Sequence, residues 1–193
     1  MDIEFEATFT NIDKDQIRTK LKKLGAELIK SEFLQKRVVF NLPKGNEIKG
    51  GWLRVRDEGD KITMSLKVVD GNKIHNQKEI YLKINDFNEA TKFLETMGCE
   101  KKAFQENKRE LWELNGVEVC IDEWPFLEPF VEVEGPSEEM VKGVSELLEF
   151  DYSTALFCAV GTLYNLKFGI SEHIINNQIP EILFNMKNPF TNQ

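Results

Sequence analysis

Polar and apolar residues alternate along several short stretches of this chain, and this period is typical of strands with one apolar face. The first stretch is "DIEFEATF", residues 2 to 9, in which Ile3, Phe5 and Ala7 alternate with acidic residues. The alternation returns in "WLRVRDEG", "KITMSLKVVDGN", "NQKEIYLKIN", "VEVCIDEW" and "PFVEVEG", and further strands are predicted in "EFLQKRVVFNLP" and "KKAFQENKRELWEL". The pattern therefore predicts an antiparallel sheet of six or more strands.

Three stretches have helical spacing of their apolar residues instead. We predict helices over residues 14–24, 86–98 and 137–150, with Asp13, Asp86 and Ser137 at their starts. These residue types are favoured at helix N-caps because their side chains accept hydrogen bonds from the first free backbone N–H groups. Residues 151–193 carry short helical or irregular segments, and we expect them to pack on the main domain.

Composition narrows the class of protein. The chain has 193 residues, 41% hydrophobic and 30% charged, with a formal net charge of −8. Nucleic-acid binders are usually basic, so we expect no nucleic-acid partner. We also expect no membrane partner, since no apolar run approaches the about 20 residues that a membrane helix needs. Three cysteines without a CxxC pair, and a start without a signal peptide, indicate a cytoplasmic protein.

The charged faces of the predicted strands are sorted by sign. Glu4 and Glu6 make the first strand acidic, Arg54 and Arg56 make "LRVR" basic, and "VEVE" is acidic again. One interpretation is an open sheet whose charged face meets water. The other is an α+β fold with a closed antiparallel β-barrel, in which the charged faces line the interior and the helices pack outside. The number of two-faced strands and the sorting by sign favour the barrel.

An interior with separate acidic and basic patches suits a polyphosphate and a divalent cation. Arginine and lysine bind phosphate oxygens, and carboxylates bind hard cations such as Mg²⁺ or Mn²⁺. A metal between Glu4 and Glu6 would relieve the repulsion of like charges aligned on one strand face.

The charged stretches, taken in order, resemble a known family. They are "EFE", "LRVR", "MSLKV", "QKEIYLKI", "NKRELW" and "VCIDEWPFLEPFVEVEG". Together they are similar to the CYTH superfamily, the triphosphate tunnel metalloenzymes, which include class IV adenylate cyclases, thiamine triphosphatases and inorganic triphosphatases. The class IV cyclase-like branch is the most similar. The resemblance covers residues 1 to about 165, so we predict a triphosphate-tunnel domain over 1–165 and a C-terminal appendage over 166–193.

The resemblance implies a site, a cofactor and a substrate. The metal, Mg²⁺ or Mn²⁺, would be held by Glu4, Glu6, Asp122, Glu132 and Glu134. The triphosphate, such as ATP or inorganic triphosphate, would be bound by Arg54, Arg56, Lys67, Lys108 and Arg109. Lys67 and Lys83 are candidates for a catalytic role, and Glu79 and Glu118 for either ligand contact or interior salt bridges. Since the superfamily includes monomers and dimers, a homodimer is an open alternative.

Two positions depart from the family pattern. Thr8 stands where the family has a lysine, and Tyr81 stands where it has a second glutamate. Three hypotheses follow: a metal-dependent enzyme that converts ATP to cyclic AMP and pyrophosphate or hydrolyses a triphosphate, a decayed enzyme that only binds a nucleotide or polyphosphate, and a structural protein that binds a partner through an open charged sheet.

Overall fold

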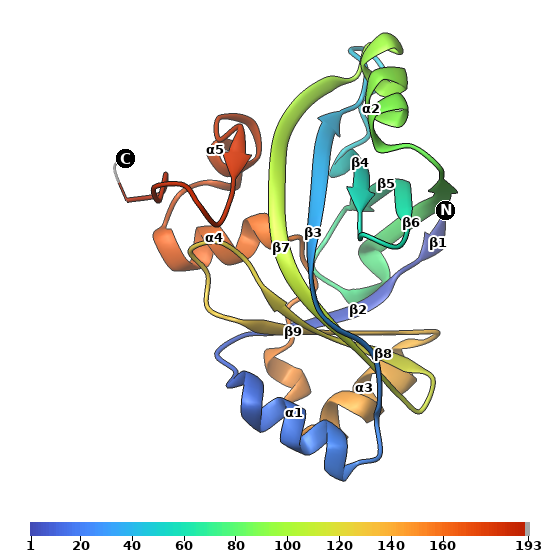
Figure 1. The fold of residues 1–193 in the computed structure, drawn as a ribbon, viewed down its shortest axis with the longest axis vertical. Helices are drawn as coiled ribbons and strands as arrows, with labels where there is room; N and C mark the ends of the chain where they lie inside the picture. The colour runs from blue at the N-terminus through green and yellow to red at the C-terminus, as the bar shows by residue number, and fades with distance from the viewer. Residues whose placement is uncertain (192–193) are drawn as a thin grey trace.

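The alternating strands curve into a nearly closed antiparallel barrel, which confirms the predicted fold class (Figure 1). The structure is a computed structural model and describes residues 1–191. The strand order around the sheet is β1-β6-β5-β4-β3-β7-β8-β9-β2. The strands are β1 Asp2–Ile3, β2 Phe5–Phe9, β3 Glu27–Asn41, β4 Gly51–Asp57, β5 Ile62–Val69, β6 Gln77–Ile84, β7 Glu100–Leu114, β8 Val117–Glu123, β9 Phe130–Gly135 and β10 Glu181–Ile182.

The N-terminal strand closes the barrel. We predicted one strand over residues 2–9, but the structure divides it at Glu4 into β1, which pairs with β6, and β2, which pairs with β9. The backbone N–H of Glu4 donates to the carbonyl of Gln77 (3.0 Å), and the Gln77 side chain donates to the carbonyl of Glu6 (2.7 Å). The first residues of the chain therefore connect the two ends of the sheet.

The three predicted helices form where the spacing placed them, within two or three residues at their ends. Asp13, Asp86 and Ser137 accept hydrogen bonds from the first N–H groups of α1, α2 and α3. The helices are α1 Lys14–Lys23, α2 Phe87–Thr96, α3 Glu138–Leu147, α4 Val160–Phe168 and α5 Glu172–Asn177. None of the described helices has the length and apolar character to cross a membrane.

Helices cover the apolar outer faces of the strands. At one end of the molecule, α1 and α3 lie together (Figure 1), and their buried Leu21 and Val141 belong to one core with Phe9, Val119 and Val133 of the strands. At the other end, α2 packs Leu94 in a core with residues of β3 and β4. Because side chains alternate across a strand, this packing leaves the polar faces inside the barrel.

The C-terminal segment packs against the side of the barrel. The short strand β10 pairs parallel with β7, and α4 and α5 lie beside β7 (Figure 1). Tyr164 of α4 is fully buried, and its hydroxyl donates to the carbonyl of Pro125 at 2.8 Å. The domain boundary that we predicted between residues 165 and 166 falls inside α4 and stays a prediction.

We expect Leu21→Ala to lower the free energy of unfolding by about 2–5 kcal/mol, because it empties a fully buried site between a helix and the sheet. Leu166→Ala, on the exposed side of α4, should change it by only about 0.5 kcal/mol. Urea denaturation followed by circular dichroism measures both. Equal losses for the two variants would contradict the assigned core.

Candidate active site

The barrel encloses a cavity of about 590 Å³ that contains most of the charged residues named from the sequence. Those that line it are Glu4, Glu6, Arg54, Arg56, Lys67, Glu79, Arg109, Glu118, Glu132 and Glu134. Since they come from seven different strands, the site exists only when the sheet has closed. The sequence interpretation of an open, solvated charged face is therefore wrong.

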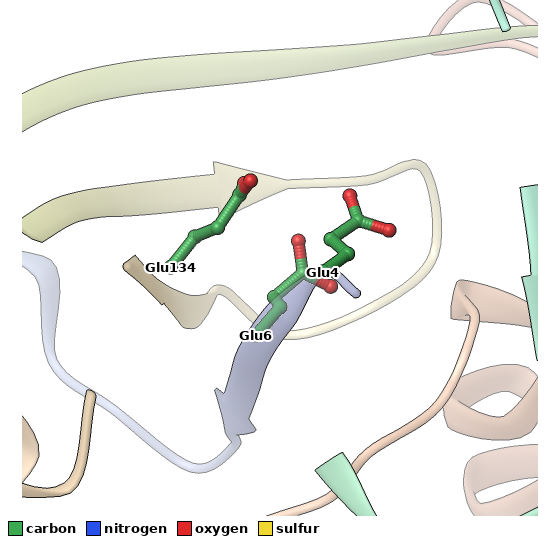
Figure 2. A group of neighbouring side chains, drawn as sticks. All are labelled: Glu4, Glu6 and Glu134. Carbon is green, nitrogen blue, oxygen red and sulfur yellow. The ribbon is translucent and has the colours of Figure 1, made fainter. Parts of the chain in front are cut away.

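Three carboxylates gather in this cavity (Figure 2). Oxygen atoms of Glu4, Glu6 and Glu134 lie within 4.8 Å of one another, and these residues come from the break between β1 and β2, from β2 and from β9. Glu6 and Glu134 are brought together by the antiparallel register, in which they are direct partners. Among residues 1–191, neither forms an ion pair with a basic side chain.

Burial and repulsion by neighbouring carboxylates disfavour the charged forms of Glu6 and Glu134. Burial, together with Glu132 and Glu4, raises the pKa of Glu6 well above its usual value. Burial and Glu4 raise the pKa of Glu134 to about 7. Three clustered carboxylates, of which only Glu4 has a cationic partner, match the ligand preference of a hard divalent cation, so these residues fit Mg²⁺ or Mn²⁺.

Basic residues on neighbouring strands face the same cavity, each beside a carboxylate. Lys67 lies 2.7 Å from Glu4, and Arg54 lies 3.1 Å from Glu79. Burial opposes the charge of Lys67, but Glu4 and other carboxylates raise its pKa above the ordinary value. Lys67 is therefore protonated at neutral pH, which suits anion binding better than the abstraction of a proton.

Arg109 is held from two sides. Its guanidinium contacts the carboxylate of Asp122 through Nε (2.9 Å) and Nη2 (2.6 Å), and it also contacts Glu132. Asp122 has no exposed surface, does not line the cavity, and accepts another hydrogen bond from Asn107. Asp122 was a candidate metal ligand, but the structure does not bring it to the three carboxylates, because Arg109 from the neighbouring strand occupies its oxygens.

Two lysines named from the sequence also lie apart from the cavity. Lys108 points to the outer face of β7, where its ammonium is 3.6 Å from Glu123 and near the ring of Phe184. Lys83 is exposed near the end of β6 and does not line the cavity. Lys108 alternates with the inward-facing Arg109, so only one of that pair could face inward.

The two departures from the family pattern differ in position. Tyr81 lines the cavity from β6 and is 41% exposed. Thr8 is buried opposite Glu132, and its backbone forms a bridge with Leu156. The chain after Leu156 continues along the cavity with residues 158 to 162, the last three of which begin α4.

Sequence reasoning missed several charged lining residues, among them Arg37, Glu58, Lys61 and Lys102. The sequence could have indicated that Arg37 faces inward, since it lies on the same face of the predicted strand "LQKRVVF" as Gln35 and Val39. Burial lowers the pKa of Lys102. Glu58 and Lys61 lie at or beside the turn from β4 to β5, where no alternation shows which way a side chain points.

The fold and the site together define a class of protein, a tunnel barrel whose acidic and basic residues face one interior cavity. Residues 2–157 match the family model of the CYTH domain. The chain therefore belongs to the CYTH domain family.

Individual relatives agree with this assignment. A Methanocaldococcus jannaschii protein named as a candidate adenylate cyclase is 28% identical over 151 residues, which cover 77% of this chain and 82% of the relative. A candidate adenylate cyclase from Vibrio parahaemolyticus has the same fold, with a TM-score of 0.73, 13% identity, and coverage of 84% of this chain and 97% of the other. A Hippeastrum protein named as a candidate adenylyl cyclase with a dominant triphosphatase activity gives a TM-score of 0.55 at 14% identity, with coverage of 89% and 97%.

The raised pKa of Glu134 predicts how pH affects stability. Between its ordinary value of 4.5 and about 7, the folded state binds a proton that the unfolded chain has released, so stability falls as pH rises through this window. Glu134→Gln should remove part of that loss, whereas Glu95→Gln, at an exposed carboxylate of α2, should not. Melting temperatures from pH 4.5 to pH 8 test this, and parallel profiles for the two variants would contradict it.

A divalent cation should offset the loss of stability that occurs as pH rises. We expect Mn²⁺ to raise the melting temperature more at pH 8 than at pH 5, because protons compete for the same carboxylates. The stabilisation should approach about 3 kcal/mol when free Mn²⁺ is about 100 times its dissociation constant. Glu6→Gln should abolish most of it, and an unchanged Mn²⁺ effect in that variant would place the cation elsewhere.

Proposed function

We propose that this protein is a divalent-metal-dependent enzyme that acts on a nucleoside triphosphate in the barrel cavity, converting ATP to cyclic AMP and pyrophosphate. The observation that carries the proposal is the shared cavity, in which three clustered carboxylates lie near several basic side chains. The name of the Methanocaldococcus relative supports the cyclase reaction in preference to other chemistry on triphosphates.

The chain's own residues bind and orient the substrate. Lys67, Arg54 and Arg109 would neutralise phosphate oxygens, since buried cations stabilise the charge that develops during phosphoryl transfer. Glu4, Glu6 and Glu134 would hold Mg²⁺ or Mn²⁺, which lowers the pKa of an attacking hydroxyl and offsets charge on the substrate. Glu132 and Asp122 hold Arg109 in place through its guanidinium.

The reaction balances without a further reactant. The ribose 3′-oxygen forms a bond to the α-phosphorus, the bond from that phosphorus to the bridging oxygen breaks, and pyrophosphate leaves with the electron pair. The 3′-hydroxyl proton passes to the pyrophosphate that leaves. Lys67 does not accept it, because neighbouring carboxylates keep Lys67 protonated.

Hydrolysis is a second candidate, because the Hippeastrum structure is named for a dominant triphosphatase activity on the same fold. Water would then attack in place of the ribose hydroxyl, and the same basic residues would bind the phosphates. The two reactions differ in which phosphorus faces the carboxylates, and therefore in the orientation of the bound substrate.

The test is one reaction with purified protein, ATP and Mn²⁺ at neutral and alkaline pH, with the products separated by ion exchange. We expect cyclic AMP and pyrophosphate. ADP or AMP without cyclic AMP would establish hydrolysis instead. If ATP and inorganic triphosphate both remain unchanged, the enzyme proposal is wrong and a binding protein becomes the better account.

We expect Glu6→Gln to lower kcat by about 100-fold or more, because it removes one of the three proposed metal ligands. Glu95→Gln keeps the same change in charge at an exposed site and should leave kcat within twofold, so it serves as the matched control. Steady-state rates with Mn²⁺ measure both. Retention of full activity by Glu6→Gln would exclude this carboxylate from the metal site.

A further inference from the structure

Arg37 lies in the middle of β3 and faces the cavity, yet it is only 5% exposed. Its direct partner on β4 is Arg56, and its direct partner on β7 is Gln105. Two arginines face each other here across adjacent strands, an arrangement that destabilises a sheet unless something compensates the charge.

The neighbouring arginines have carboxylate partners, but Arg37 does not. Arg54 contacts Glu79, Arg56 contacts Glu58 at 2.7 Å, and Arg109 contacts Asp122. Among residues 1–191, Arg37 forms no ion pair with a carboxylate. Burial and the three nearby arginines lower its pKa well below the usual value, which reflects how poorly the protein itself compensates this charge.

Neutral groups hold the Arg37 side chain in one position. Its Nη2 donates to the side-chain oxygens of Gln35 and Asn107, its guanidinium lies over the ring of Trp124 at 4.5 Å, and its Nε has no partner. Asn107 is itself fixed, because its amide nitrogen donates to Asp122 at 3.0 Å. The arrangement orients a guanidinium toward the cavity and leaves donor capacity unused.

The position of Arg37 relative to the carboxylates indicates which part of a ligand it meets. Lys67, Arg54 and Arg37 lie on β5, β4 and β3, which follow β6 in that order around the sheet. Glu4 donates its backbone N–H to Gln77 of β6, and its carboxylate pairs with Lys67. The basic residues thus extend away from Glu4 in the order Lys67, Arg54, Arg37. A linear polyphosphate whose reacting phosphorus lies at the carboxylates would place its far end near Arg37.

We propose that Arg37 binds the terminal phosphoryl group of the substrate and makes the cavity selective for three linked phosphoryl groups over two. The inference rests on the proposed function, in which the cavity takes a triphosphate. An uncompensated guanidinium that is already oriented loses little side-chain entropy on binding and gains charge-assisted hydrogen bonds to phosphate oxygens.

The experiment measures binding without turnover. Calorimetry in EDTA compares inorganic triphosphate, pyrophosphate and ATP with the unsubstituted protein, Arg37→Gln and Arg37→Lys. We expect Arg37→Gln to weaken the binding of triphosphate and ATP by about 10- to 100-fold, the range of one charge-assisted contact. The binding of pyrophosphate should weaken by no more than about twofold. Arg37→Lys should recover part of the loss, because it keeps the charge without the planar fork.

Two controls separate ligand binding from structure. Lys36→Gln removes a positive charge from the exposed face of the same strand and should leave all three affinities unchanged. The melting temperature of Arg37→Gln should equal or exceed that of the unsubstituted protein, because an uncompensated buried charge is removed. A purely structural arginine would instead lower the melting temperature.

The outcomes are distinct from those of the activity test. If Arg37→Gln weakens the binding of triphosphate and pyrophosphate equally, or weakens neither, the proposed role of Arg37 is wrong even in an active enzyme. Loss of ATP binding alone would overturn it in favour of a contact to the nucleoside. Absence of any triphosphate binding by the unsubstituted protein in EDTA would overturn this inference but not the proposed function, since the enzyme is proposed to act with a divalent cation. Selective binding without turnover when Mn²⁺ is supplied would overturn only the proposed catalytic activity.

Discussion

Closure of the sheet by the first residues of the chain is the constraint on which the site depends. The strand divides at Glu4, so that β1 pairs with β6 and β2 pairs with β9. Gln77 fixes this division by hydrogen bonds to the backbone on both sides of Phe5. Two of the three clustered carboxylates belong to this short segment, so the contact that closes the barrel also assembles the acidic group.

The same closure places charged side chains of like sign next to one another in the interior. Buried carboxylates repel one another at one side of the cavity, which raises the pKa of Glu134 and Glu6, and buried arginines repel one another at the other. Such groups reduce the stability of the empty protein, because each is desolvated without full compensation. The helices outside offset this cost through apolar cores, so the apolar core and the charged interior are built from opposite faces of the same strands.

The sequence correctly predicted where most of the strands lie and which face of several turns inward, but it did not predict which side chains meet across neighbouring strands. Period-two alternation correctly assigned Glu4, Arg54 and Glu134 to an inner face, because a strand in a barrel has only two faces. Alternation says nothing about which residues meet across strands. The contact of Asp122 with Arg109 follows from register, and that contact is why a carboxylate on the correct face does not reach the cavity. Arg37 was readable as inward-facing, but its lack of a carboxylate partner emerges only when β3, β4 and β7 are placed together.

The cavity is not built from the family domain alone. The family match ends at residue 157, whereas the lining continues through residues 158 to 162 and includes Glu172 and Asn176 of α5. Gly161 allows the close approach of these two helices, since a Cβ there would lie 3.1 Å from the amide of Asn176, and Thr162 donates to Glu172 at 2.7 Å. Trp124, which supports Arg37, belongs to the same core as Tyr164 of α4. The C-terminal segment thus contributes to one wall of the cavity and supports the residue that we infer to select the length of the polyphosphate.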